Sequence, residues 1–300
     1  HDSEDFKGLE DESLTFPKIL MNPLNHGSLA MLPIFATRWG FADVPWDAFC
    51  ARVKNAGYDG LEAKLPDDEA GQREALDAIA AHGLTWVGHE NTNHLPPDFA
   101  RYGPAYEQLL RETAAHRPAF INVQTGKDYF SFEQNLALID AAARVAEETG
   151  VPIFHETHRG KWSYHPGVTR RYLDARPDLR LTLDASHWCC VTESMLEHHG
   201  EDLDAAIART GYVHTRVGYA EGPQVSDPRA PEWQDALNTH LGWWDRVVAV
   251  QGESLLGMSP EFGAPPYLPV FPYTRQPLVS QWEVNEFMLG VLRGRYEKPH

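Results

Sequence analysis

An apolar stretch in the middle of the chain, Val151-Pro-Ile-Phe-His-Glu-Thr-His158, ends in residue types that can do chemistry. Side chains alternate between the two faces of an extended strand, so Glu156 and His158 point to the same side. A carboxylate at the mouth of a buried strand is costly unless it is paired or holds a metal ion. The stretch therefore predicts a functional site whose remaining partners lie elsewhere in the chain.

Strands and helices alternate from about Met31 onward, which indicates how such partners are positioned. The predicted strands span 32–37, 59–64, 84–88, 119–123, 151–158, 179–184, 212–217 and 255–261. The predicted helices span 45–56, 68–82, 106–116, 132–149, 168–175, 202–209, about 233–244 and 281–293. Strand-helix alternation predicts a parallel sheet, and eight units favour a closed (β/α)8 TIM barrel of the α/β class.

The barrel is expected to take residues 29–300 as one domain. Residues 1–28 lack periodicity, begin with His and contain His26-Gly-Ser28, which resembles a cloning junction. Two interpretations of this segment stay open, a tag or linker remnant and a native N-terminal arm.

Charge and cysteine content narrow the class of protein. The formal net charge of -17 argues against partners that are bound by general electrostatics, such as nucleic acid or an anionic membrane. No apolar run approaches the roughly 20 residues of a membrane helix. Of the three cysteines, Cys189 and Cys190 are adjacent and Cys50 is distant. No disulfide framework follows, so a reducing, cytoplasmic location is expected.

Metal-ligand residue types stand at the carboxyl ends of four consecutive predicted strands, where barrel active sites lie. This set of three carboxylates and one imidazole consists of Glu156, Asp184, His214 and Glu261. Clustered carboxylates repel one another unless a cation joins them. The donor types suit one divalent ion, with Mn²⁺ preferred and Mg²⁺, Co²⁺ or catalytic Zn²⁺ as alternatives.

These motifs resemble the xylose-isomerase-like TIM-barrel superfamily, which holds sugar isomerases and epimerases, inosose dehydratases and endonuclease IV. The resemblance covers nearly the whole chain from about Met31. Besides the Glu that ends the fifth strand, it is carried by Asp184-Ala-Ser-His187, His214-Thr-Arg216 and Ser259-Pro-Glu-Phe262.

The resemblance implies that Glu156, Asp184, His214 and Glu261 bind the metal and that His187 and Arg216 hold substrate oxygens. By similarity to ketose 3-epimerases, the two glutamates also move the proton. An endonuclease ranks last, because the chain is acidic and its first strand ends in Thr37-Arg-Trp39.

Further residues are candidates from their positions alone. His158 is the preferred auxiliary base because it points with Glu156. For Glu62, substrate contact and an internal ion pair with Lys64 are both open. The other candidates are pocket-wall residues His89 and Gln124, and Trp39, Trp162 and Trp188 as stacking faces for a sugar, with Trp188 alternatively in the core.

The expected function is a divalent-metal-dependent sugar isomerase or epimerase that moves a proton next to a carbonyl through a metal-stabilised enediolate. One alternative is a metal-dependent lyase or dehydratase acting on a keto-sugar, inosose or glycoside. It is favoured by His158, since simple epimerases often carry a second Glu just after strand five. The second alternative is a non-catalytic metal-binding barrel subunit. The expected partner is a small-molecule carbohydrate, and a homo-oligomer is compatible with the long loops 218–231 and 263–277.

Overall fold

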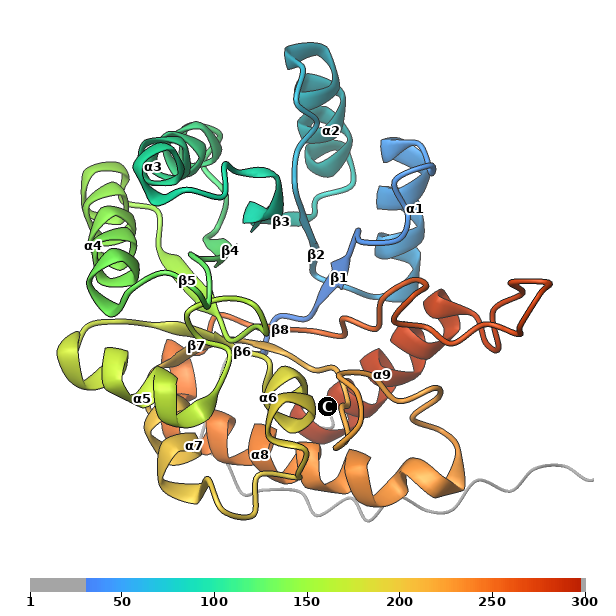
Figure 1. Cartoon of the computed structure of the whole chain (residues 1–300). Helices are drawn as coiled ribbons and strands as arrows, with labels where there is room; N and C mark the ends of the chain where they lie inside the picture. The colour runs from blue at the N-terminus through green and yellow to red at the C-terminus, as the bar shows by residue number, and fades with distance from the viewer. Residues whose placement is uncertain (1–30, 298–300) are drawn as a thin grey trace, which may run out of the picture.

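The computed structural model describes residues 31–297, and these form the predicted barrel (Figure 1). Eight parallel strands follow one another in chain order around a single sheet. They are β1 (Phe35–Thr37), β2 (Gly60–Ala63), β3 (Thr85–Asn91), β4 (Ile121–Gln124), β5 (Ile153–Glu156), β6 (Leu181–Leu183), β7 (Thr210–His214) and β8 (Met258–Ser259). A parallel bridge between Ile34 and Met258 joins the last strand to the first and confirms the closed architecture.

Helices surround the sheet on its outer side (Figure 1). They are α1 (Trp46–Ala56), α2 (Glu69–Ala81), α3 (Phe99–Ala115), α4 (Phe132–Thr149), α5 (Pro166–Ala175), α6 (Ala185–Thr192), α7 (Gly200–Ile207), α8 (Gln234–Gln251) and α9 (Gln281–Tyr296). Short 3₁₀ turns lie at Thr92–His94, Pro231–Trp233 and Gly252–Ser254. Helix α4 agrees best with the prediction. It begins with a capping box at Ser131, and it ends at Gly150, which adopts the left-handed conformation.

Two helical segments differ from the prediction. Helix α3 begins seven residues earlier than expected, because Asp98 caps its first turn by accepting a hydrogen bond from the Arg101 amide. Pro104 is tolerated inside α3 because the buried Tyr102, Tyr106 and Leu110 hold one face of the helix against the barrel. Helix α6 was not predicted; it is short, and its N-cap is Asp184.

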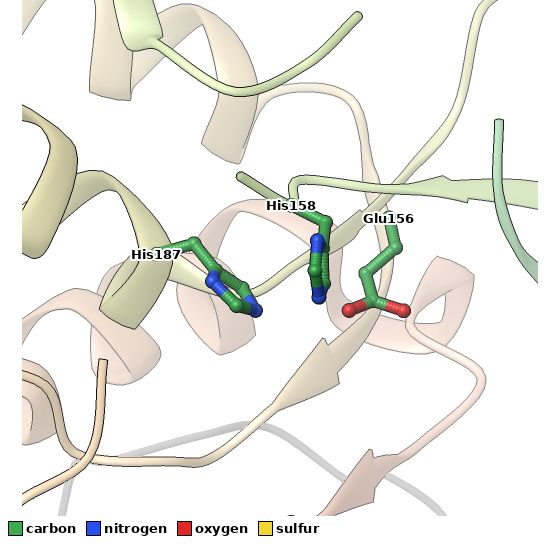
Figure 2. Close-up of side chains that lie close together, drawn as sticks. All are labelled: Glu156, His158 and His187. Carbon is green, nitrogen blue, oxygen red and sulfur yellow. The ribbon is translucent and has the colours of Figure 1, made fainter. Parts of the chain in front are cut away.

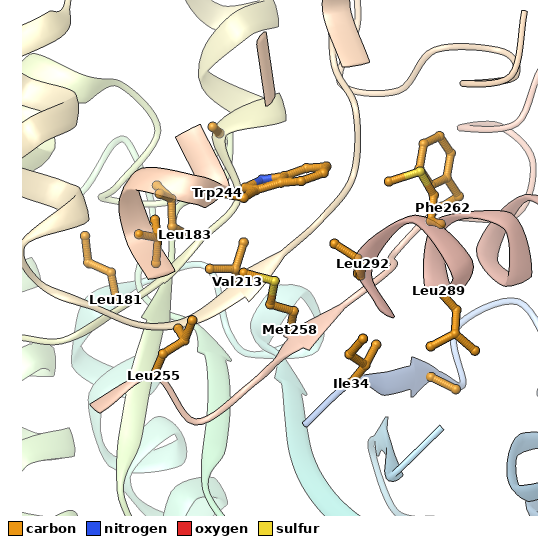
Figure 3. Packing of buried hydrophobic residues seen from close by; sticks show 14 of the residues in the cluster. Ile34, Leu181, Leu183, Val213, Trp244, Leu255, Met258, Phe262, Leu289 and Leu292 are labelled. Atoms are coloured by element: carbon orange, nitrogen blue, oxygen red, sulfur yellow. The ribbon is translucent and has the colours of Figure 1, made fainter. Parts of the chain in front are cut away.

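The largest part of the core lies between the strands and the outer helices. Figure 3 shows Leu181, Val213 and Met258 on neighbouring strands, facing Trp244 of α8 and Leu292 of α9. Strand β8 has only two residues, and Pro260 directly after it has no backbone N–H to extend the ladder. Packing against α8 and α9 therefore holds β8 in place where its own hydrogen bonds are few.

A layer of large side chains fills the inside of the barrel. Phe35, Val87, Phe154 and Tyr212 come from alternate strands, and Phe120 completes the cluster. Ring centroids of Phe120 and Tyr212 lie 4.9 Å apart in edge-to-face contact. This aromatic floor closes the barrel below the level where the strands end.

Among residues 31–297, no helix is long and apolar enough to cross a membrane. The segment that was predicted to be a tag or an arm, residues 1–28, lies outside the described part of the chain.

Candidate active site

The strand geometry brings the predicted metal ligands to one level above the aromatic floor. Glu156 and His214 each follow a floor residue by two positions, Phe154 and Tyr212, so they point into the barrel on the same side. Asp184 and Glu261 follow the ends of β6 and β8 at the same edge of the sheet. Each of the four residues offers one ligand atom, and these atoms all lie within 4.8 Å of one another. The four side chains are buried.

The orientation of the His214 ring fits a metal ligand. Its Nε2 lies 2.9 Å from Oε2 of Glu62, an arrangement in which Nε2–H donates to a carboxylate. Its Nδ1 lies 2.9 Å from Oε2 of Glu261, yet neither atom has a hydrogen-bond partner among the described residues. Both atoms are thus buried and adjacent to each other, with no third protein atom bonded to them, as expected of donors that share a cation.

Glu62 is tied to the barrel interior rather than to Lys64. Its carboxylate accepts hydrogen bonds from the Tyr212 hydroxyl at 2.8 Å and from Asn122 Nδ2 at 2.8 Å, in addition to the contact with His214. Lys64 instead pairs with Asp67 at 2.7 Å, so the interpretation of Glu62 as an ion-pair partner of Lys64 was wrong. Glu62 also lines the cavity, so its role toward substrate stays a prediction.

Asp184 and Arg216 form a buried ion pair beside the ligand set. Asp184 Oδ1 also accepts from the Ser186 amide at 3.0 Å, which is the cap of α6. Arg216 donates to His187 Nε2 at 2.7 Å. His187 is fully buried and does not line the cavity, whereas Arg216 does.

His158 lies between Glu156 and His187 (Figure 2). One ligand-type atom from each of the three residues falls within the same 4.8 Å limit, so His158 lies next to Glu156, and its role as an auxiliary base stays a prediction. The His158 ring packs on that of His187, with centroids 3.8 Å apart. Its Nδ1 lies 2.5 Å from the Arg159 carbonyl, so Nδ1 carries the proton and Nε2 keeps its lone pair.

Burial and neighbouring charges separate the titration of the two glutamates. Burial raises the pKa of Glu156 to about 7. For Glu261 burial acts against ionisation, but the charges of His214 and Arg216 prevail and lower its pKa to about 2. Although burial opposes it, the surrounding carboxylates raise the pKa of His214. The negative charge of the clustered carboxylates thus exceeds the positive charge of the cationic side chains beside them. In such sites a divalent ion takes the place of a bound proton.

The site opens into a cavity of about 570 Å³. Of the predicted substrate contacts, Trp39, Glu62, His89, Gln124 and Arg216 line it, together with Glu156, His158 and Glu261. Trp162 and Trp188 do not line it; both are buried, and Trp162 packs on Tyr172 of α5. Their interpretation as sugar-stacking faces was wrong because helix packing covers both rings.

Sequence reasoning missed Tyr267, which lines the cavity from the loop after β8. Its ring meets Trp39 edge-on at 4.9 Å, and the Arg216 guanidinium lies 5.0 Å from its centre. Gly263 in the same loop accepts a close approach of Trp39 that a Cβ atom would block. The only advance signal was the length of this loop.

Sequence reasoning also missed Lys161, which is buried in the loop after β5. Its Nζ donates to Asn93 Oδ1 at 2.8 Å and to Thr92 Oγ1 at 3.0 Å. No carboxylate among the described residues pairs with it. Burial and the nearby Lys127 charge lower its pKa to about 7. Lys161 therefore connects the loop after β5 to that after β3, where Asn93 lines the cavity.

No family model matches the chain, and no curated protein matches it. Several solved structures do match the chain. The 3-keto-D-glucoside 4-epimerase YcjR from E. coli is 16% identical with a TM-score of 0.57, covering 87% of this chain and 99% of its own.

A xylose isomerase-like TIM barrel protein from Mycobacterium smegmatis in complex with magnesium is 11% identical, with a TM-score of 0.57 and coverage of 88% and 98%. The IOLI protein with a bound zinc atom is 14% identical, with a TM-score of 0.57 and coverage of 89% and 100%. The chain therefore has the fold of the xylose isomerase-like TIM barrels.

Proposed function

We propose that the protein is an enzyme, a divalent-metal-dependent sugar isomerase or epimerase. The observation that carries this proposal is the buried set of Glu156, Asp184, His214 and Glu261, whose ligand atoms converge beside a cavity of sugar-accommodating size. A divalent ion held by these residues supplies Lewis-acid polarisation of a carbonyl, which acidifies the neighbouring C–H bond. Mn²⁺ is our preferred ion from the oxygen-rich donor set.

The protein's own residues supply the proton transfer. Glu156 and Glu261 both reach the cavity surface, so each can face a substrate carbon. His158 adds an unprotonated Nε2 next to Glu156, because the Arg159 carbonyl fixes its other nitrogen as the donor. In this proposal Arg216, Gln124 and His89 hold substrate oxygens from the cavity wall.

The structural neighbours support the same reaction class. One acts as an epimerase on a keto-glucoside, and two others hold magnesium and zinc. Epimerisation, isomerisation and elimination all begin with loss of a proton next to a carbonyl. The fold is shared by several reactions, so the assignment rests on the site rather than on likeness.

The test combines metal analysis with proton exchange. Wild-type protein is expected to hold one divalent ion per chain and to incorporate deuterium from heavy water into keto-sugars such as D-fructose, D-tagatose or 3-keto-glucosides. Glu156→Gln should lose exchange and weaken metal binding, since an amide is a poorer ligand than a carboxylate. His158→Gln should lose exchange while keeping the metal, because His158 is not in the four-ligand set.

Absence of a bound divalent ion in wild type would refute the metal centre. Metal without deuterium exchange would refute the proton-transfer chemistry. Release of water or an aglycone instead of an isomer would place the reaction among the lyases.

A further inference from the structure

Arg38 is a buried cation at the mouth of the barrel that has no carboxylate partner among the described residues. It directly follows β1, and the residue is 9% exposed. Residues 31–297 contain two buried arginines, and the other, Arg216, is paired with Asp184. Lys64, another cation at the cavity, is paired with Asp67. In a chain with a net charge of -17, an unpaired buried guanidinium calls for an explanation.

The surroundings hold the Arg38 guanidinium in place without a direct ion pair to a described carboxylate. Its carbon Cζ lies 3.8 Å from the centre of the Trp46 ring and 4.8 Å from that of Phe49. Nη2 donates to the Val44 carbonyl at 2.7 Å, and Nη1 is buried and has no hydrogen-bond partner among the described residues. Stacking and one neutral acceptor position the group, but they leave donor capacity unused.

Arg38 and Glu156 line one cavity from opposite walls, because β1 and β5 lie across an eight-stranded barrel from each other. The cavity lining includes the apolar Trp39, Trp46, Leu65 and Pro66, and the charged Lys64 and Asp67 there are paired with each other. An ion pair in such a setting is weakly screened and strong, and a guanidinium matches a carboxylate with two parallel hydrogen bonds.

We propose that Arg38 is a recognition site for a carboxylate carried by the substrate at the end remote from its reacting carbon. The substrate class is then a keto-sugar acid rather than a neutral sugar. This inference rests on the proposed function only in placing the reacting carbon beside Glu156.

The test is a binding measurement on metal-loaded protein. D-fructuronate and D-fructose share a ketone at the same carbon and differ by a terminal carboxylate in place of a hydroxymethyl group. By calorimetric titration we expect wild type to bind D-fructuronate about tenfold or more tightly, the scale of one desolvated charge pair. Arg38→Met should remove this preference while leaving the dissociation constant for D-fructose within about twofold, because D-fructose has no carboxylate for Arg38 to bind.

Two variants separate recognition from packing. Arg52→Met is the matched control, because Arg52 stacks on Trp282 at 3.9 Å in the same way but does not line the cavity. It should keep the full preference for D-fructuronate. Arg38→Lys keeps the charge without the planar fork and should retain part of the preference.

Equal binding of the two sugars by wild type, binding of neither, or a preference that survives in Arg38→Met would overturn the Arg38 site. These outcomes differ from failure of the proposed function, which would appear as missing metal or missing deuterium exchange whatever the binding preference.

Discussion

At the scale of single residues, Glu62 decides which nitrogen of His214 faces the other ligands. Its carboxylate is held by Tyr212 and Asn122, so it is a fixed acceptor for the Nε2 proton of His214. Carboxylates that orient a histidine ligand in this way raise its basicity and restrict its ring. Under the proposed function, Glu62 therefore supports metal affinity without touching the ion.

Glu62→Gln should lower the affinity for Mn²⁺ about tenfold to a hundredfold, because an amide no longer enforces one tautomer of His214. Competition with a fluorescent chelator measures this change. Glu90→Gln is the matched control: Glu90 is a buried carboxylate of β3 that accepts from Thr113, outside the ligand cluster. If both variants lose affinity equally, the orienting role of Glu62 is wrong.

Lys161 gives a pH-dependent prediction at the same scale. Its folded pKa of about 7 lies below the unfolded value of 10.5, so the folded state disfavours its protonation. Its contribution to stability is full above the unfolded pKa and is lost as pH falls toward 7. The lost stability is on the order of 1 kcal/mol per pH unit between these limits.

The measurement is the free energy of unfolding of wild type and Lys161→Met between pH 7 and pH 10. The difference between the two proteins should change with pH, since the variant lacks the titrating group. A difference that is constant over this range would contradict the burial of an unpaired Lys161.

At the scale of elements, the strands were predictable and many contacts between them were not. Local alternation and helix caps located β5, α4 and their neighbours, and the barrel topology then placed Glu156, Asp184, His214 and Glu261 at one edge. The contact between Glu62 and His214 joins residues 152 positions apart, and no local pattern encodes it. The burial of Trp162 was not predictable from local sequence either, because it depends on how α5 packs against the ring.

Strand β7 passes close to the aromatic floor at Gly211. A Cβ atom there would lie 2.6 Å from the Phe154 ring. Gly211→Ala should therefore destabilise the protein by about 1–3 kcal/mol through overpacking. Gly242→Ala in α8 is the control, since nothing lies within 4 Å of its Cβ position, and it should be stabilising by about 0.5–1 kcal/mol. Denaturant unfolding that ranks the two variants the other way would contradict the packing of the floor.

At the scale of the whole molecule, the proposed metal ion would join four consecutive strands that are otherwise joined by short ladders. Strand β8 contributes Glu261 just after its two residues. An ion that binds only the folded barrel stabilises it by mass action, by about 2.7 kcal/mol at a hundredfold excess over its dissociation constant.

Removal of the ion by a chelator should therefore lower the unfolding temperature of wild type by several degrees. Added Mn²⁺ should restore it, and Glu261→Gln should show a much smaller response. Differential scanning calorimetry measures both changes. An unfolding temperature that stays the same after addition of chelator or Mn²⁺ would argue against a metal shared by β5 to β8.

The aromatic floor has a kinetic consequence. Because Phe35, Phe120, Phe154 and Tyr212 fill the barrel beneath the proposed ligands, residues 31–297 leave the cavity open at the carboxyl ends of the strands rather than through the floor. Substrate therefore enters and product leaves at the same end of the barrel. Product and substrate then use the same opening of the cavity, so product should inhibit competitively. The loop that carries Tyr267 lies beside this opening.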